Sequence, residues 1–404
     1  MEFEVWWLLV VPLVFVLGWC AARFDLRQAR KTAQTLPSSY FRGVNFLLNE
    51  QPDHAIDAFL EVANLNTETA ELHFALANLF RKRGEVDRAI RIHESLKGRA
   101  DLSEHHRLQA VYESGVDYLR AGILDRAEAA FESLRDTPRA AEASRKLLEL
   151  YEIEKAWDKA IAEAGRLQSL DAPIKLSDIA HFHCELAEVA LSDDDSIRAF
   201  EALSDALAVH PGSVRATLMM GEIALAHDDR DKAIEYWHAS EKQNPWYLPL
   251  VGLHLWKAYE AKGAVAEGLA ALERYCTDYP SIDLLKVWVD ALLQNHGPHE
   301  AYARLRMQIR RLPSLLGLDR LLLMQIDSTD DEERRRDLVM MRELMARHTA
   351  RLARFRCHIC GFQAKQFYWQ CPGCATWDSI IPRRVEELDF YPIPDKPPVA
   401  AHSP

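Results

Sequence analysis

The sequence predicts an all-α protein, in which a superhelical solenoid of paired helices follows one transmembrane helix and precedes a small metal-binding ribbon. Three observations lead to this fold class. A pattern of small residues recurs about every 34 residues through the middle of the chain, an uncharged stretch lies near the N-terminus, and two C-x-x-C pairs lie near the C-terminus. With 404 residues, the chain has room for all three parts.

The first predicted element is a transmembrane helix within residues 1–22. Val5–Ala22 is an uncharged run of eighteen residues with tryptophans near both ends. As a helix this run would be about 27 Å long, which is just enough to cross a hydrocarbon core of about 30 Å. A cleaved signal peptide is the alternative, but it would begin with basic residues. This chain carries Glu2 and Glu4 there, and no lysine or arginine precedes the run.

Residues 23–37 are predicted to form a basic juxtamembrane linker. Because lysine and arginine accumulate on the cytoplasmic side of membrane helices, the bulk of the chain is expected in the cytoplasm. A total of seven cysteines, an odd number, agrees with such a reducing compartment. Cys20 could be acylated at this end of the helix, although contact with lipid is the simpler interpretation. The basic residues of the linker are Arg23, Arg27, Arg30 and Lys31.

Residues 38–354 are predicted to form the helical array. Each unit has a small residue in its first helix and another early in its second, and the second-helix positions recur at intervals of 33 to 39 residues. In several units a bulky aromatic residue follows four positions later. The second-helix positions are Ala55, Ala89, Ala127, Ala160, Ala199, Ala233, Gly268 and Ala301, the clearest first-helix positions are Gly43, Ala77, Gly115, Ala187 and Gly221, and the bulky residues are Phe59, Phe131 and Trp237.

This is the tetratricopeptide pattern, in which two antiparallel helices cross closely at the small residues and a large side chain fills the space beside them. We therefore predict about eight repeats, followed by a final helix pair over Leu315–Phe355 with an acidic loop at Asp327–Glu333. Stacked pairs offer an extended concave surface that binds peptides, helices or whole domains. Four prolines are expected to end repeats, at Pro211, Pro245, Pro280 and Pro313.

No motif in the sequence points to catalysis. The chain has no glycine-rich phosphate loop, nucleophile elbow or paired-histidine metal motif. His181 and His183 are two positions apart and so lie on different faces of a helix, which predicts one packed and one exposed histidine. Asp193–Asp195 is expected to be a solvated turn, and Cys184 and Cys276 are expected to be buried core residues. We therefore expect a binding protein, not an enzyme.

The charge of the chain argues against general nucleic-acid binding. The formal net charge is −12, whereas nucleic-acid-binding proteins usually carry a basic excess. Arg347, Arg351 and Arg354 are spaced to share one face of a helix, and Arg356 follows them. A solvated stripe is the simplest interpretation. Contact with anionic lipid head groups, or with a protein partner, is the alternative.

Two C-x-x-C pairs, separated by ten residues, predict a metal site near the C-terminus. This spacing can bring four thiolates around one metal ion, and the reducing compartment disfavours the alternative of two disulfides. Gly361 and Gly373 allow the backbone to turn tightly below the sulfur atoms. The segment Gly361–Gln370 is expected to form a short β-hairpin. The predicted metal ligands are Cys357, Cys360, Cys371 and Cys374.

The predicted metal ion has two interpretations. In one, the ion is structural and contributes on the order of 10 kcal/mol to the folding of a module at residues 355–382. In the other, it is a redox-active iron. A site filled by four protein ligands leaves no open position for a substrate, which argues against metal-based hydrolysis. The aromatic residues expected to pack around the site are Phe362, Phe367, Tyr368, Trp369 and Trp377. Residues 383–404 are predicted to form a Pro-rich tail, and the part from Pro392 onward is expected to be disordered.

The segment RCHICGFQAKQFYWQCPGCATWDSI resembles a rubredoxin-like metal-binding domain, with C-x-x-C-G in its first pair and C-P-x-C in its second. Two features depart from electron-carrying rubredoxins: the intervening stretch is much shorter, and Ala375 stands where glycine is usual. Rubredoxin resemblance implies iron, and zinc is equally compatible with four cysteines. A rubredoxin-like redox protein, recruited to a partner by its repeats, is therefore the alternative function.

The order of membrane helix, repeats and metal module resembles the lipopolysaccharide assembly protein B family of Gram-negative bacteria. The resemblance covers the full chain, including the opening repeat Tyr40–Phe59. It implies an adaptor in the inner membrane that regulates lipopolysaccharide synthesis by promoting degradation of the lipid A pathway deacetylase LpxC by the protease FtsH. It also implies that other lipopolysaccharide-pathway proteins are partners and that the four cysteines are metal ligands. From the repeat array and the closed four-cysteine site we further expect the metal module to dock against the repeats. A homo-oligomer is compatible with the sequence.

Overall fold

The computed structural model describes residues 70–311, 313–349 and 354–384, together with scattered residues between positions 19 and 58. Apart from Trp19, the predicted membrane helix lies outside the described residues, as do the linker at residues 23–37 and the tail beyond Arg384. Most of the opening repeat also lies outside them. Within the described part of the chain, none of the helices is both long and apolar enough to cross a membrane.

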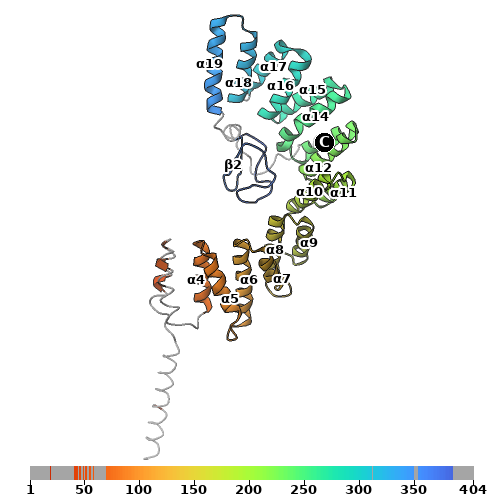
Figure 1. Ribbon diagram of the computed structural model, residues 1–404. Coiled ribbons are helices and arrows are strands. Elements are labelled where there is room, and N and C mark those ends of the chain that lie inside the picture. Colours follow the sequence, from red (N-terminus) through yellow and green to blue (C-terminus); the bar gives the residue numbers. More distant parts are fainter. Residues whose placement is uncertain are drawn as a thin grey trace, which may run out of the picture. The chain divides into compact units, whose positions relative to one another are not determined.

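The chain divides into two compact units, Met1–Leu150 and Tyr151–Pro404, with the boundary inside one helix (Figure 1). The described helices of the first unit are α4 (Ala70–Lys82), α5 (Val86–Lys97), α6 (Glu104–Arg120), α7 (Leu124–Glu132) and most of α8 (Ala140–Glu154). The second unit contains α9 (Trp157–Ser169), α10 (Leu176–Ser192), α11 (Ser196–Val209), α12 (Val214–Ala226), α13 (Arg230–Gln243), the 3₁₀ helix η1 (Pro245–Tyr247), α14 (Leu248–Lys262), α15 (Val265–Asp278), α16 (Ile282–His296), α17 (Pro298–Arg311), α18 (Leu315–Ser328) and α19 (Glu332–Thr349).

Close helix crossings at small residues confirm the tetratricopeptide-like solenoid. All eight predicted second-helix positions are buried. Gly115 of α6 faces Phe131 of α7, and a Cβ atom at Gly115 would lie 2.7 Å from the Phe131 ring. In the same way, a Cβ atom at Gly221 of α12 would overlap with the indole of Trp237 in α13. The aromatic side chain of the second helix therefore occupies the space that the missing side chain of the first helix leaves.

A left-handed residue reverses the chain between the two helices of each repeat from α4 to α17. The predicted turn at Asp193–Asp195 is one example, in which Asp194 has φ +59°. Glycine adopts this conformation without the strain that a Cβ atom brings, and aspartate tolerates it better than most residues. The residues at these turns are Gly84, Gly122, Lys155, Asp194, Asp228, Gly263 and Gly297.

Side-chain caps fix the starts of several helices. Ser103 accepts a hydrogen bond from the backbone N–H of His106, and Asp195 accepts one from Arg198. Each cap satisfies one of the donors that a helix leaves free at its N-terminus. The other described caps of this kind in the α-helices are Ser213, Asp229 and Ser314.

One core cluster of the second unit runs from α13 to α18 without interruption. Trp237, Tyr275 and Trp288 are its largest fully buried side chains. Cys184 and Cys276 are buried as predicted, and burial raises the pKa of the Cys184 thiol to about 12. Burial raises the pKa of Cys276 as well. Both thiols are therefore protonated and unreactive at neutral pH.

The C-terminal module is a small ribbon with one two-stranded sheet. Strand β1 (Phe355–Arg356) pairs antiparallel with β2 (Gln363–Ala364) around the first C-x-x-C pair. The predicted hairpin within Gly361–Gln370 is therefore wrong. Gly361, with φ +76°, closes the first turn, and the N–H of Cys357 donates to the carbonyl of Phe362, so this segment pairs with residues that precede it.

Helices α18 and α19 form the predicted final pair, but the predicted arginine stripe is not continuous. Helix α19 ends at Thr349, and Arg354 lies beyond it, where it donates to a carboxylate oxygen of Asp283 in α16 at 2.9 Å. Arg347 is exposed on α19, whereas Arg351 lies outside the described residues. Arg354 is thus part of the contact between ribbon and solenoid.

Gly221→Ala is expected to lower the free energy of unfolding by about 1–3 kcal/mol, because the new methyl group overlaps with the buried indole of Trp237. The matched control is Gly165→Ala in α9, where no other atom lies within 4 Å of the new Cβ. This control should stabilise the protein by about 0.5–1 kcal/mol. Chemical denaturation measures both effects, and equal effects would contradict the close crossing of α12 and α13.

Candidate metal centre

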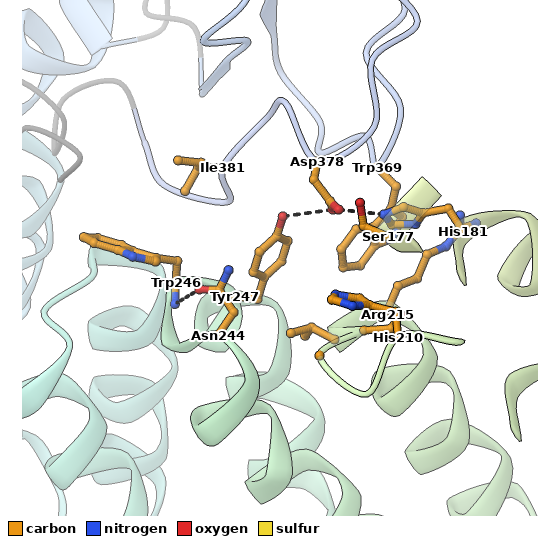
Figure 2. Close-up of a pocket in the computed structure, with 13 residues that line it drawn as sticks. Ser177, His181, His210, Arg215, Asn244, Trp246, Tyr247, Trp369, Asp378 and Ile381 are labelled. Carbon is orange, nitrogen blue, oxygen red and sulfur yellow. Dashed lines mark hydrogen bonds and ion pairs between the residues drawn. The ribbon is translucent and has the colours of Figure 1, made fainter. Parts of the chain in front are cut away.

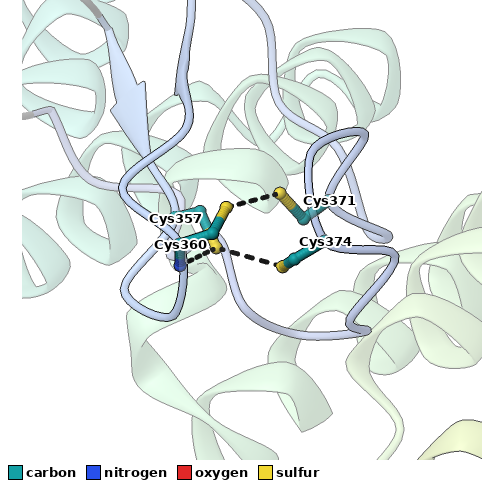
Figure 3. Close-up of side chains that lie close together, drawn as sticks. All are labelled: Cys357, Cys360, Cys371 and Cys374. Carbon is teal, nitrogen blue, oxygen red and sulfur yellow. Dashed lines mark hydrogen bonds between the residues drawn. The ribbon is translucent and has the colours of Figure 1, made fainter. Parts of the chain in front are cut away.

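Four cysteine sulfur atoms converge in the ribbon (Figure 3). The Sγ atoms of Cys357, Cys360, Cys371 and Cys374 all lie within 4.8 Å of one another. Cys357 Sγ is 3.8 Å from Cys374 Sγ, and Cys360 Sγ is 3.7 Å from Cys371 Sγ. Tetrahedral zinc with bonds of about 2.3 Å would separate its sulfur ligands by about 3.8 Å, whereas a disulfide requires about 2.05 Å. The cluster therefore could bind one metal ion, and its thiols are not paired as disulfides.

Backbone donors point at two of the four sulfur atoms. The N–H of Cys360 points at Cys357 Sγ, with a nitrogen–sulfur distance of 3.5 Å, and the N–H of Gly373 points at Cys371 Sγ at 3.4 Å. Burial raises the pKa of Cys357, but the N–H of Cys360 and the hydroxyl of Ser379 outweigh this effect and bring the pKa to about 6. Hydrogen bonds to the charged form thus compensate for burial of the sulfur.

The turn after the second pair needs a left-handed residue. Ala375 has φ +53°, which costs about 1–2 kcal/mol for a residue with a Cβ atom. The N–H of Ala375 donates to the carbonyl of Cys371 at 2.8 Å, so the turn is fixed by the second pair itself. This conformation explains why glycine suits the position in rubredoxin-like modules.

Two of the cysteines belong to the small core of the ribbon. Cys357 and Cys371 are buried together with Phe355 and Ile380. Three of the predicted aromatic residues, Phe362, Phe367 and Tyr368, pack against this core. The other two, Trp369 and Trp377, make ring contacts with the solenoid, so the prediction that they surround the metal site is wrong.

The side chain of Trp377, in the ribbon, packs against helices of the solenoid. Its indole stacks on the His181 ring of α10, with 4.7 Å between ring centres and an angle of 13° between ring planes. Its edge faces Trp157 of α9 at 6.2 Å. The indole N–H donates to a carboxylate oxygen of Glu152 at 3.1 Å, and the same oxygen accepts a hydrogen bond from the Gln370 side chain at 3.1 Å. One face, an edge-on ring contact and the polar N–H of this side chain therefore all have partners in the solenoid.

Trp369 makes a second aromatic contact with the solenoid, beside that of Trp377. Its ring stacks on Tyr247 of η1, with 5.2 Å between centres and an interplanar angle of 7°. The guanidinium of Arg215 in α12 lies 5.9 Å from the centre of Trp369 and 5.8 Å from that of Trp377. Arg215 is only 3% exposed and donates to two glutamates of α10 at 2.8 and 2.7 Å. A paired, buried cation therefore underlies both tryptophans.

Asp378 links these contacts to the metal module (Figure 2). One carboxylate oxygen accepts a hydrogen bond from the Tyr247 hydroxyl at 3.2 Å, and the other lies 2.9 Å from His181 Nε2. Burial raises the pKa of Asp378, but His181 and Tyr247 outweigh it and hold the pKa below its usual value of 3.8. A cavity of about 260 Å³ remains beside these residues. The carboxylate is thus charged, and both of its oxygens have partners at the contact between ribbon and solenoid.

Arginines at the ends of the ribbon hold it to later repeats. Arg354 and Arg384 both donate to a carboxylate oxygen of Asp283 in α16, at 2.9 and 2.8 Å. Arg383 donates to the carbonyl of Pro280 at 3.1 Å, and its guanidinium lies 3.8 Å from the centre of the Trp246 ring. The contacts of the ribbon therefore extend from α8 to α16, and Figure 1 shows it within the arc of the helices of the second unit.

Sequence reasoning located the cysteines but missed the residues that receive the ribbon. His181 is buried as one packed histidine, although its partners come from the ribbon, and His183 is half-buried rather than exposed. No sequence motif marks Arg215 or Tyr247. A buried arginine beside two tryptophans indicates the docking site of the ribbon only when the packing is known.

The comparisons with known proteins agree with this architecture. The family model described as rubredoxin metal binding domain matches residues 355–382, and the tetratricopeptide repeat model matches residues 112–170. The chain is 34% identical over 378 residues to lipopolysaccharide assembly protein B of Escherichia coli strain K12, covering 93% of this chain and 97% of that protein. This chain belongs to the lipopolysaccharide assembly protein B family.

A second member of the family, from Haemophilus influenzae strain Rd, is 30% identical over 387 residues and also covers 93% of this chain and 97% of its own. The solved structure of the C-terminal part of a TPR repeat-containing protein from Cytophaga hutchinsonii is 13% identical. It covers 61% of this chain and 98% of that chain, with a TM-score of 0.41.

Ala375→Gly is expected to stabilise the metal-loaded ribbon by about 1 kcal/mol, because glycine adopts the left-handed conformation without strain. Ala364→Gly in β2 is the matched control and should destabilise it by about 0.5–1 kcal/mol. The rate at which a chelator removes the metal, together with chemical denaturation, measures both variants. A destabilising Ala375→Gly change would refute the strained turn.

Asp378→Asn is expected to weaken docking of the ribbon by about 1–3 kcal/mol, because a neutral amide accepts more weakly from His181 and Tyr247. Since the pKa of Asp378 is depressed on folding, its contribution is fully present above about pH 4 and is lost only as the pH falls further. The loss should therefore be measured at neutral pH, well above this range. Hydrogen exchange of the ribbon amides measures it, with Asp194→Asn in an exposed turn as the control. Unchanged exchange in Asp378→Asn would exclude this contact as an anchor.

Proposed function

We propose that this chain is a non-enzymatic adaptor in lipopolysaccharide assembly, held at the cytoplasmic face of the bacterial inner membrane. Membership of the lipopolysaccharide assembly protein B family supports this function. One structural observation carries it: the four-cysteine ribbon is packed across the repeats from Glu152 to Asp283. The metal module therefore acts as an internal brace that shapes a binding surface.

The geometry of the cysteine cluster favours this role over catalysis. Four thiolates occupy every position of a tetrahedral ion, so no substrate can reach the metal without displacing a ligand. Residues at the contact between ribbon and solenoid, including His181 and Asp378, are paired with one another. A structural ion, which contributes folding free energy directly, suits this arrangement.

The partners in this proposal follow from the family. The adaptor would bring LpxC to the protease FtsH, so that the amount of deacetylase, and hence of lipopolysaccharide, is limited. Val5–Ala22 would anchor it in the same membrane as FtsH. The repeats would provide the protein-binding surface, as solenoids of this kind generally do.

Replacement of one buried ligand tests the proposal. In cells whose own copy is replaced, Cys371→Ser should remove the metal, unfold the ribbon and let LpxC accumulate several-fold. Cys276→Ala, which changes a buried cysteine outside the cluster, is the control and should leave LpxC unchanged. Elemental analysis and immunoblots give the two readouts. Normal LpxC turnover in a metal-free Cys371→Ser chain would refute the braced adaptor.

Two further readouts separate this function from its alternatives. A colourless zinc protein would agree with a structural ion, whereas a coloured iron that cycles between oxidation states in the cell would favour the redox function. Deletion of Val5–Ala22 should abolish regulation while the repeats stay folded. If the untethered chain restored normal lipopolysaccharide at native abundance, the membrane part of the proposal would fail.

A further inference from the structure

A second concave site lies among the last helices of the solenoid, where the C-terminal end of the ribbon meets α16. It is a groove of about 270 Å³ between α16 and α18, with Arg342 of α19 at its edge. Its walls are apolar: Ile282, Leu285 and Leu305 are each at most 5% exposed, and Leu316 and Leu323 add to the lining. Nothing in the proposed function uses this groove.

Charged residues of both signs line the rim of the groove. Lys286, Arg320, Arg342 and Arg384 line it together with Asp319. The three arginines are paired with Asp290, Asp319 and Asp283, respectively. Lys286 is exposed and has no ion-pair partner among the described residues. The groove therefore suits a segment that combines apolar side chains with negative charge.

The next residues of the chain have this composition. Arg384, the last described residue, lies on the rim and is anchored there by Asp283 at 2.8 Å. The nine residues that follow, Val385–Ile393, read VEELDFYPI, with three acidic residues, five large apolar ones and no lysine or arginine. We propose that this segment of the chain itself occupies the groove.

The sequence of the segment matches the groove in register as well as composition. In an extended chain, alternate side chains point to opposite sides, so Leu388 and Phe390 would enter the groove together. Glu387 and Asp389 would then lie on the open side of the groove, where Lys286 is exposed. Pro392 favours an extended conformation of the residue before it. Nine extended residues reach about 30 Å, and the segment starts at the rim, so no linker is needed.

Covalent attachment makes this docking effective even if the groove binds weakly. A segment tethered at the rim has an effective concentration in the millimolar range. A partner with a similar acidic and apolar segment must therefore displace the tail before it binds. Only ligands that bind the groove more strongly than the tethered Val385–Ile393 segment would therefore occupy it.

The experiment compares the full chain with a chain that ends at Arg384, using a fluorescent synthetic peptide of residues 385–394 as the probe. The shortened chain should bind the peptide at least about tenfold more tightly than the full chain, in which the tail already fills the groove. A peptide with Leu388→Ser and Phe390→Ser should bind more than about tenfold more weakly, because both apolar contacts are lost.

Charge reversal on the rim locates the site. In the shortened chain, Lys286→Glu should weaken peptide binding about fivefold, because attraction becomes repulsion. Lys257→Glu, an exposed lysine on α14 outside the groove, is the matched control and should change nothing. Both lysines are on the surface, so neither change is expected to unfold the protein.

Four results would overturn the proposal. Equal peptide affinity of the full and shortened chains would show that the tail does not occupy the groove. Absence of binding to the shortened chain, or binding that ignores Lys286→Glu, would place the segment elsewhere. A photoreactive group at position 390 of the full chain should crosslink to α16 or α18 of the same chain, and crosslinks only between copies would make a second chain the occupant. None of these readouts depends on LpxC or on lipopolysaccharide, so they test the groove separately from the adaptor function.

Discussion

Convergence of four sulfur atoms on one point is the constraint on which the second unit depends. The ribbon has only two short strands and a core of a few side chains, too little to fold without the bonds that a metal ion would add. Once the two C-x-x-C pairs are fixed, the turn at Ala375 is fixed, and Trp377 and Asp378 follow it directly. These two residues meet His181. The metal site and the inner surface of the solenoid are therefore one cooperative structure.

Periodicity made the solenoid predictable. Small residues such as Gly115 and Gly221 repeat because helices can cross closely only where a side chain is missing, and that requirement is local enough to be read from spacing. The cysteine cluster was predictable for a similar reason, since a tetrahedral ion restricts both residue type and spacing. The family comparisons then agreed with the order of these parts. The membrane helix stays a prediction, because Val5–Ala22 lies almost entirely outside the described residues.

The contact between ribbon and solenoid was not predictable, because its partners are distant in sequence. Trp377 and Glu152 are 225 residues apart, and nothing near either residue indicates the other. Trp369 and Trp377 could equally have covered the cysteines, as small metal modules often bury their aromatic residues. The hairpin was misplaced because the aromatic stretch after Gly361 looks like strand sequence, whereas the hydrogen bonds of Cys357 draw the pairing to the other side of the first turn.

The span of the ribbon also limits how this solenoid can vary. Repeat arrays usually gain or lose units with little harm, because each unit contacts only its neighbours. Here one rigid module touches Glu152 at one end and Asp283 at the other. Insertion or loss of a helix pair between these two points would move one anchor by the length of a repeat. The number of repeats between α8 and α16 is thus fixed by the ribbon, which is not itself a repeat. Repeats before α8 are free to change.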